Sequence, residues 1–321
     1  MSLSAIAGQE RPLRRLKSLL ASRRLPPALL FQGPRGVGKA ATALQLAKAL
    51  NCSKRKTDCC DTGAGACRGC QAAEKGIDPD IHRVDAAYQA ALLEEDAAKQ
   101  RSIRIDTVRH LIADLEMRSL EGRWKAAILD DAHTLVPAAA NAMLKALEEP
   151  PLRTLWILVT HRPGELLSTI RSRCQQIPFG PLPVERVAEL LAARGVAADE
   201  AQAAARLAEG SLGRAIELIE DPQPEPAAWL SDPLAPFKLA DELPRGLALA
   251  RPVVEERLRR MAWHVRSSRG PEGFASSAVR AVLRELSELR RALRSNADPR
   301  LVLELAALQL QRLKAAGGLP S

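Results

Sequence analysis

One stretch decides the fold of this chain: Leu29-Leu30-Phe31-Gln32-Gly33-Pro34-Arg35-Gly36-Val37-Gly38-Lys39-Ala40. Its apolar start predicts a buried strand and a leucine-rich helix follows, so the GxxxxGK pattern has the context that a phosphate-binding P-loop requires. Backbone N–H groups around Gly33, Gly36 and Gly38 would approach phosphate oxygens, and Lys39 would meet the outer phosphates of ATP or ADP. Position 40, where Ser or Thr normally helps to bind Mg²⁺, is alanine. The sequence therefore predicts a nucleotide-binding loop without its metal ligand.

Composition bounds the class of protein. With 321 residues the chain has room for two or three domains, and its 46% apolar content is that of a globular protein. No apolar run approaches the ~18 residues of a membrane helix and no apolar signal segment opens the chain, so we expect a cytoplasmic protein with no membrane contact. The net charge of +9 favours anionic partners, although solvated helix faces account for many arginines. Aromatic residues make up only 3%, which argues against a stacking platform for single strands.

Most of the cysteines lie within one short polar stretch: Cys52, Cys59, Cys60, Cys67 and Cys70. A stretch with almost no apolar residues cannot fold around its own core, and four thiolates on a tetrahedral Zn²⁺ would supply the missing order. Cys67 and Cys70 have the C-x-x-C spacing of half a zinc site, whereas Cys59 and Cys60 are neighbours that compete for one ligand position. Free thiols in a loop are the alternative, but such clustering is uncommon in reducing compartments. We therefore expect a structural zinc site.

Acidic residues end another apolar strand. Residues 126–129 are followed by Asp130 and Asp131, and beside a P-loop this arrangement resembles a Walker B element, whose first acid holds Mg²⁺ through water. The second acid would polarise the attacking water, and Asp131 is one methylene shorter than the glutamate that ATPases favour there. Residues 154–160 predict a further buried strand, with Thr160 at its end placed to sense a γ-phosphate. Two acids at a strand end are common in turns, so this interpretation depends on the P-loop.

Weaker signals complete the secondary structure. Residues 81–84 predict a short strand, and Asp106 is typical of a helix N-cap. Pro137 fits the first turn of another helix. A last strand is expected to start at Cys174 or shortly after it, at about Gln176, and to end at about Phe179.

Three domains follow from these patterns. Alternating strands and helices over residues 1–180 predict a parallel sheet with helices on both faces and a zinc insert at about 52–70. The strand signal then ends, and residues 181–221 read as three short helices. The proline-rich run 221–226 predicts a rigid linker. Helical patterns with apolar stripes occupy residues 227–321.

Several motifs together resemble one family, the bacterial clamp-loader AAA+ proteins. They are GPRGVGK (33–39), CRGCQ (67–71), the strand before Asp130, AANAMLKALEEPP (139–151), RSRC (171–174), GSLGR (210–214) and NADPRLVLE (296–304). The ALEEPP and SRC motifs are highly specific to this family. The resemblance covers nearly the whole chain and implies an α/β P-loop AAA+ domain, a helical lid and an all-α collar domain. Within the family, the chain is similar to the delta-prime subunits of DNA polymerase III.

The resemblance implies roles for single residues and for partners. Arg173 takes the SRC position, whose arginine reaches into the ATP site of a neighbouring subunit, while Thr160 takes the sensor-1 position and Arg214 the sensor-2 position. The collar would hold a hetero-pentamer with gamma/tau and delta subunits, which loads a sliding clamp onto primed DNA during replication. Delta-prime subunits typically do not hydrolyse ATP, so we expect little or no ATPase activity from this chain, as one part of a nucleotidyltransferase holoenzyme.

Two features depart from the family pattern. The family's zinc spacing is close to C-x8-C-x2-C-x2-C, whereas this chain has C-x6-C-C-x6-C-x2-C, which leaves open whether Cys59 or Cys60 is the ligand. Delta-prime members often lose the P-loop, but this chain keeps Lys39 and the loop glycines. The chain could therefore bind a nucleotide even though we do not expect it to hydrolyse one.

Three other classes of protein deserve comparison. A gamma/tau motor subunit would carry Ser or Thr at position 40 and Glu at position 131. A small-molecule P-loop kinase would not need the zinc insert, the SRC motif or the helical C-terminal part. A zinc-dependent DNA-binding module would place its thiolates beside a recognition helix rather than a P-loop.

Overall fold

The computed structural model describes residues 2–22, 24–54, 57–60, 65–96, 100, 102–117, 119, 123–220, 232, 234–267 and 277–315. The chain divides into two compact units, residues 1–220 and residues 221–321, and each is described by itself. Within the described ranges, no helix combines the length and the apolar character needed to cross a membrane. The predicted linker at 221–226 lies outside the described residues.

A parallel five-stranded sheet forms the centre of the first unit. Its strands are β1 (Ala28–Gln32), β2 (Ile81–Val84), β3 (Lys125–Leu129), β4 (Thr154–Thr160) and β5 (Gln175–Pro178), in the spatial order β2-β3-β4-β1-β5. All four neighbouring pairs run parallel. The three central strands are mostly apolar and are buried along almost their whole length, because both faces of the sheet are covered. This confirms the predicted fold class.

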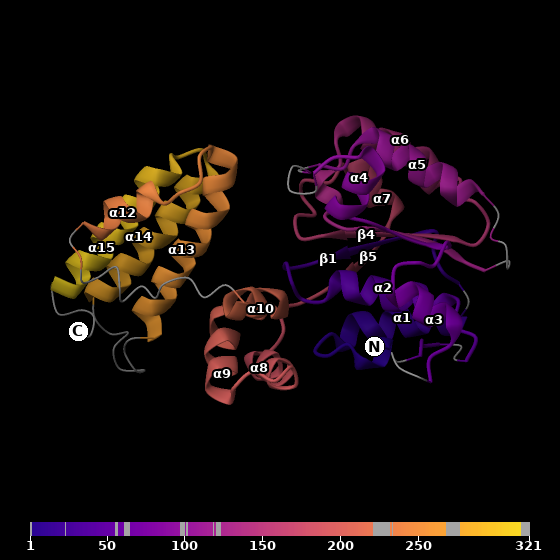
Figure 1. The fold of residues 1–321 in the computed structure, drawn as a ribbon, viewed down its shortest axis with the longest axis horizontal. Coiled ribbons are helices and arrows are strands. Elements are labelled where there is room, and N and C mark those ends of the chain that lie inside the picture. Colours follow the sequence, from indigo (N-terminus) through magenta and orange to yellow (C-terminus); the bar gives the residue numbers. More distant parts are fainter. Residues whose placement is uncertain are drawn as a thin grey trace. The chain divides into compact units, whose positions relative to one another are not determined.

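Helices cover both faces of the sheet (Figure 1). One face carries α1 (Glu10–Ser22), α2 (Lys39–Leu50) and α3 (Arg68–Glu74), and a short 3-10 turn, η1 (Leu3–Ala5), precedes them. The other face carries α4 (Ala86–Leu93), α5 (Ile105–Glu116), α6 (Pro137–Glu148) and α7 (Ser168–Arg173), and the 3-10 turn η3 (Ala132–Thr134) lies between β3 and α6. Successive β4 side chains alternate between the two cores, since Ile157 joins the first core while Trp156 joins the second.

Three short helices end the first unit. They are α8 (Val184–Ala192), α9 (Ala198–Leu207) and α10 (Leu212–Glu220), and they enclose a small core of their own around Val187 and Ala205. We call these three helices the lid.

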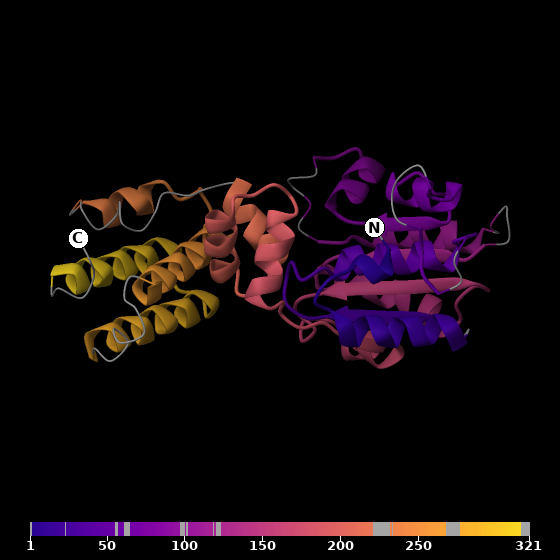
Figure 2. The same cartoon turned by 90° about the horizontal axis from the view of Figure 1, so that it is seen from below.

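The second unit is helical throughout its described part (Figure 2). It contains α12 (Ala235–Asp241), α13 (Leu247–Ser267), α14 (Ser277–Arg294) and α15 (Pro299–Ala315). Helix α15 packs against the other three, and Leu303 and Leu310 are fully buried in the shared core. The amphipathic stripes expected in this part of the chain therefore form one helical bundle.

Two local predictions were wrong. Asp106 is not the N-cap of α5, because the helix begins at Ile105 and Arg104 takes the cap position. The buried Gln89 side chain fixes this start, since its Oε1 accepts hydrogen bonds from the Arg104 backbone N–H and the Thr107 hydroxyl, both at 2.8 Å. A contact with α4, a helix that the sequence patterns did not reveal, thus replaces a local cap.

Cys174 was expected at the start of the last strand. It instead follows the last residue of α7, and β5 begins at Gln175. The Cys174 side chain is buried all the same.

Candidate nucleotide site and zinc centre

The predicted nucleotide residues meet at one edge of the sheet. β1 leads into the P-loop, β3 ends just before Asp130, and β4 ends at Thr160. Because β3, β4 and β1 are parallel neighbours, their carboxyl ends lie side by side. Gln32, the residue before the P-loop, is the register partner of Thr160. The structure therefore brings the P-loop, the two acids and Thr160 to one place.

The P-loop requires glycine at two positions for steric reasons. Gly33 has φ +148°, and a Cβ there would lie 2.2 Å from the Phe179 carbonyl oxygen. Gly36 has φ +73°, and its Cβ would lie 2.2 Å from Ser211 Oγ. The third glycine, Gly38, is the N-cap of α2, so the positive end of that helix faces the loop. This arrangement is the one that cradles phosphate oxygens in P-loop proteins.

The Lys39 side chain is hydrogen-bonded to backbone carbonyl groups of the P-loop itself. Its Nζ donates to the carbonyl oxygens of Gly33 at 2.9 Å and Pro34 at 2.5 Å, and only 5% of the residue is exposed. Burial lowers the Lys39 pKa to about 8, against the opposing charges of Asp130 and Asp131. A bound phosphate would exchange these carbonyl contacts for an anionic partner and would raise the Lys39 pKa back toward its ordinary value.

The two acids differ in environment. Burial raises the pKa of Asp130, and the neighbouring Asp131 charge raises it further. A hydrogen bond from His161 lowers the pKa of Asp131, which is therefore the readily ionised acid of the pair. Since residue 40 is alanine, Asp130 has no hydroxyl partner in the P-loop with which to share a magnesium ion.

Two histidines at this edge were not found from the sequence. His161 Nδ1 lies 3.1 Å from Asp131 Oδ1, and His133 Nδ1 lies 3.3 Å from the Thr160 hydroxyl. Burial and the neighbouring His161 lower the pKa of His133. Thr160 is fully buried and also accepts a hydrogen bond from the Arg162 backbone N–H at 3.0 Å. The expected sensor hydroxyl is thus already engaged by protein groups.

The lid contacts the P-loop directly. The Gly213 backbone N–H donates to the Gly36 carbonyl oxygen at 3.0 Å. Arg214 follows in the first turn of α10, with its backbone N–H donating to Ser211 Oγ at 3.1 Å and its side chain 3.8 Å from Glu209. Arg214, the expected sensor-2 arginine, is therefore adjacent in sequence to Gly213, which contacts the P-loop.

Arg173 lies away from these residues. Its Nε donates to Glu148 Oε1 at 2.7 Å and its Nη1 to the Thr169 carbonyl oxygen at 3.0 Å, so the SRC and ALEEPP motifs form one ion pair at the surface. Gln175 pairs with Leu29 near the beginning of β1, whereas the P-loop follows the end of β1. A strand of this length spans about 15 Å at ~3.3 Å per residue. Arg173 is therefore not brought to this chain's own P-loop.

Four cysteines converge beside α3. One sulfur from each of Cys52, Cys60, Cys67 and Cys70 lies within 4.8 Å of the others, and the Cys52 and Cys60 sulfurs are 3.5 Å apart. In a tetrahedral thiolate site with Zn–S distances of ~2.3 Å, the sulfurs lie about 3.8 Å apart. Although burial opposes ionisation of Cys67, hydrogen bonds from the Cys70 and Ser53 backbone N–H groups lower its pKa to about 6. Donor type, number and spacing all fit Zn²⁺.

Cys59 points elsewhere. Its thiol donates to Gln45 Oε1 of α2 at 3.3 Å, and the side chain is fully buried. Burial raises the pKa of Cys59 to about 11, which keeps the thiol protonated. Of the two neighbouring cysteines, the geometry therefore joins Cys60 to the cluster.

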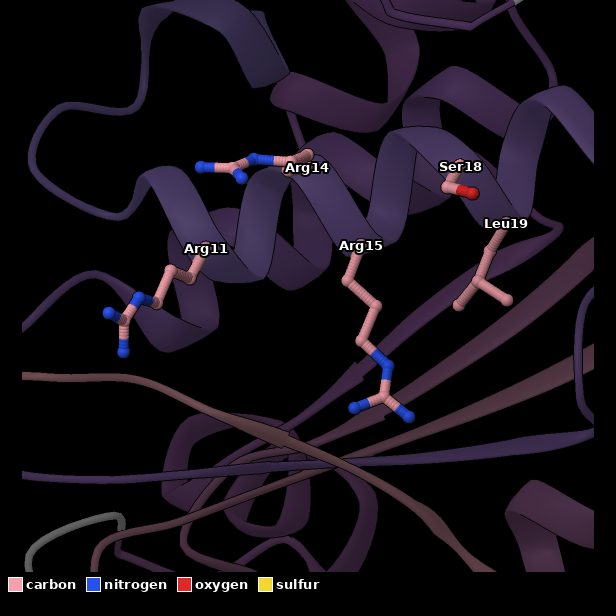
Figure 3. Close-up of a pocket in the computed structure, with 5 residues that line it drawn as sticks. All are labelled: Arg11, Arg14, Arg15, Ser18 and Leu19. Atoms are coloured by element: carbon pink, nitrogen blue, oxygen red, sulfur yellow. The ribbon is translucent and has the colours of Figure 1, made fainter.

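A separate shallow groove runs along α1 (Figure 3). It has a volume of about 510 Å³ and is lined by Arg11, Arg14, Arg15, Ser18 and Leu19. Arg15 extends toward the strands of the sheet. No P-loop residue lines this groove, so it is distinct from the nucleotide edge.

Comparison with known proteins identifies the family of this chain. The sequence pattern of the family described as "DNA polymerase III, delta subunit" matches residues 8–183, which is more than half of the chain. The chain belongs to this clamp-loader family.

Individual relatives carry several subunit names. The tau subunit of DNA polymerase III from Escherichia coli is 34% identical over 221 residues, covering 67% of this chain and 32% of that protein. The delta' subunit from Bacillus subtilis is 33% identical over 210 residues, covering 65% of this chain and 59% of that protein. The chain thus spans about a third of the tau relative and about three fifths of the delta' relative.

A solved structure supports the fold over most of the chain. The gamma subunit-related protein of DNA polymerase III from Thermotoga maritima superposes with a TM-score of 0.53 at 17% identity, covering 92% of this chain and 98% of that one.

Proposed function

We propose that this chain is a delta-prime-type subunit of a bacterial clamp loader. In this role it is the stationary AAA+ partner in a hetero-pentamer with gamma/tau and delta subunits, which loads a sliding clamp onto primed DNA with energy from ATP. The observation that carries the proposal is a P-loop that keeps Lys39 but has alanine at position 40, where a Ser or Thr hydroxyl would otherwise help to bind Mg²⁺.

The acids at the same edge support weak or absent hydrolysis. Phosphoryl transfer needs metal-bridged phosphate oxygens and an oriented water. Asp131 is shorter than glutamate and is held by His161 at 3.1 Å, while Asp130 has no hydroxyl at position 40 with which to share a metal ion. Neither acid is set up as in an active ATPase, whereas the glycines and Lys39 still provide a site for ATP or ADP.

The position of Arg173 supports a role in a neighbouring subunit. Arg173 lies just before β5, at the end of the sheet where β1 begins, so its guanidinium cannot reach the P-loop that follows the other end of β1. It can instead be presented across a subunit boundary. Its ion pair with Glu148 and its bond to Thr169 hold the planar group at the surface. A guanidinium group that is held in place and permanently charged is suited to stabilising charge on a γ-phosphate. We propose that Arg173 acts there as an arginine finger.

The remaining parts have structural roles in this proposal. Zn²⁺ on Cys52, Cys60, Cys67 and Cys70 orders the insert, and four protein ligands leave no open coordination position for chemistry. The lid contacts the P-loop through Gly213. The helical bundle of α12, α13, α14 and α15 is the collar that joins the partner subunits.

An ATPase assay tests the proposal. The purified chain alone is expected to hydrolyse ATP negligibly, and addition of partner subunits and primed DNA should produce activity that survives Lys39→Ala in this chain. Turnover by the isolated chain at the rate of an ordinary AAA+ motor, abolished by Lys39→Ala, would favour the alternative of a gamma/tau-type motor subunit. Two observations support that alternative: the chain keeps the P-loop lysine, and it shares sequence identity with the tau relative.

A further inference from the structure

Two histidines beside the nucleotide edge converge on Asp131. The distance to Asp131 Oδ1 is 3.1 Å from His161 Nδ1 and 3.9 Å from His133 Nδ1. The two imidazole rings meet edge to face, with centroids 4.4 Å apart and planes at 78°. One ligand atom from each of the three residues lies within 4.8 Å of the other two. Three good metal ligands therefore share one small volume.

We propose that Asp131, His133 and His161 bind a divalent transition-metal ion of the zinc and cobalt class. Two imidazoles and one carboxylate make up the protein ligands of several catalytic zinc and iron sites. Metal–ligand distances of ~2.0–2.2 Å in tetrahedral geometry place the ligand atoms about 3.3 Å apart. The His161 distance is about 0.2 Å shorter than this value, and the His133 distance exceeds it by about 0.6 Å. A small rotation of the largely exposed Asp131 side chain would close that difference.

The backbone holds these ligands in place. Asp131 and His133 lie on the tight turn after β3, and His161 directly follows the neighbouring strand β4. Asp131 has a left-handed backbone with φ +45°. Its carbonyl oxygen accepts two hydrogen bonds from Thr134, one from the backbone N–H at 2.8 Å and one from the hydroxyl at 2.9 Å. The carboxylate is thus turned back toward the two rings.

The ligand types select the ion. Mg²⁺ prefers oxygen ligands in octahedral geometry, and this cluster offers one carboxylate and two nitrogens. Imidazole ligands suit Zn²⁺, Co²⁺ and Ni²⁺. Three protein ligands leave at least one coordination position for water or another small ligand, which separates this site from the closed cysteine centre.

A second histidine–aspartate cluster in the same unit provides a matched comparison. His82 and His110 lie 3.7 Å and 3.5 Å from Asp114 Oδ2. Among the described residues, however, only the four cysteines and the Asp131 triad bring three ligand atoms within 4.8 Å of one another. His110 therefore contacts a carboxylate without belonging to a three-ligand cluster.

Metal binding to the full chain tests the proposal. Protein whose cysteine centre is filled with Zn²⁺ is dialysed against Co²⁺, and the total metal content is measured by elemental analysis. We expect about two ions per chain, one from each site, and a large excess of Mg²⁺ should not displace the second. In NMR spectra, paramagnetic Co²⁺ should broaden the imidazole signals of His133 and His161 but not those of His110.

Single substitutions identify the ligands. His161→Ala should weaken binding of the second ion by more than the ~10–100-fold that loss of a supporting hydrogen bond costs, and His110→Ala should leave it unchanged. Because the His133 ring is buried, His161→Ala at the more exposed ring is the decisive variant. A total of one ion per chain would overturn the proposal and leave His161 as a hydrogen-bond partner that positions Asp131. Equal loss in His161→Ala and His110→Ala would overturn it as well.

Discussion

Nucleotide binding is predicted to weaken above pH 8 because of Lys39. In the free chain, burial lowers the Lys39 pKa to about 8, and its Nζ donates only to neutral carbonyl oxygens. A bound phosphate places negative charge beside Nζ and so raises that pKa. The ammonium is already present below pH 8, whereas above pH 8 it must take up a proton for binding to occur. Affinity is therefore constant below the free pKa and falls as pH rises through it.

The size of the effect follows from this pKa. At pH 9, one unit above a pKa of about 8, the charged form is about one eleventh of the population, so affinity should fall about 10-fold relative to pH 7. This corresponds to about 1.4 kcal/mol. An ordinary lysine, with a pKa of ~10.4, would give almost no change over the same range.

Titration of the full chain with fluorescent ADP between pH 7 and pH 9.5 measures this profile, because the phosphate groups are ionised throughout. Lys39→Arg is the matched control, since a guanidinium stays charged and its profile should be flat. Constant affinity of the wild-type chain from pH 7 to pH 9 would refute this account of Lys39. So would an equal decline in Lys39→Arg.

Three further outcomes are expected. Cys67→Ser should bind about one Zn²⁺ fewer per chain than the wild type, whereas Cys59→Ser should bind as much Zn²⁺ as the wild type, both measured by elemental analysis. The reverse result would exclude Cys60 from the cluster. Gly36→Ala should destabilise the first unit by about 1–3 kcal/mol in denaturant unfolding, because its Cβ would meet Ser211 Oγ at 2.2 Å with φ at +73°. Gly164→Ala, at an open position without a positive φ, should cost little stability. If Gly36→Ala and Gly164→Ala lowered the free energy of unfolding equally, the contact between Gly36 and the lid would be unimportant. Chelation of zinc should speed proteolysis within residues 52–70 without unfolding the sheet, and global unfolding would mean that the zinc site supports the whole unit.

The sheet and the nucleotide edge could be predicted because their signals are local. A P-loop is one continuous motif, and apolar strands that end in acids or threonine mark the carboxyl edge of a parallel sheet. The positions of Lys39 in the loop after β1, of Asp130 directly after β3 and of Thr160 at the end of β4 could therefore be predicted from the sequence alone.

The histidine ligands could not be found in this way. His133 and His161 are 28 positions apart, and neither falls in a spacing typical of metal sites. They meet because β3 and β4 are neighbours, which is a property of strand order rather than of local sequence. The choice between Cys59 and Cys60 likewise depended on a distant group, Gln45 of α2, which takes the Cys59 thiol.

Long-range contacts also decided two other details. The start of α5 is fixed by Gln89 from α4, so the local cap signal at Asp106 was misleading. The ion pair between Arg173 and Glu148 joins residues 25 positions apart. No pattern in either motif indicates that pair.

The central claim is that this chain serves its neighbour's ATP site rather than its own. The most direct measurement is DNA-stimulated ATP hydrolysis by a reconstituted loader that carries either Arg173→Ala or Lys39→Ala in this chain, with Arg171→Ala as control and assembly checked by size. We predict that Arg173→Ala slows the site it serves by ~10³-fold or more, as loss of an arginine finger does elsewhere, while Lys39→Ala and Arg171→Ala leave hydrolysis intact. Full activity of Arg173→Ala in an assembled complex, or loss of activity in Lys39→Ala, would contradict the claim.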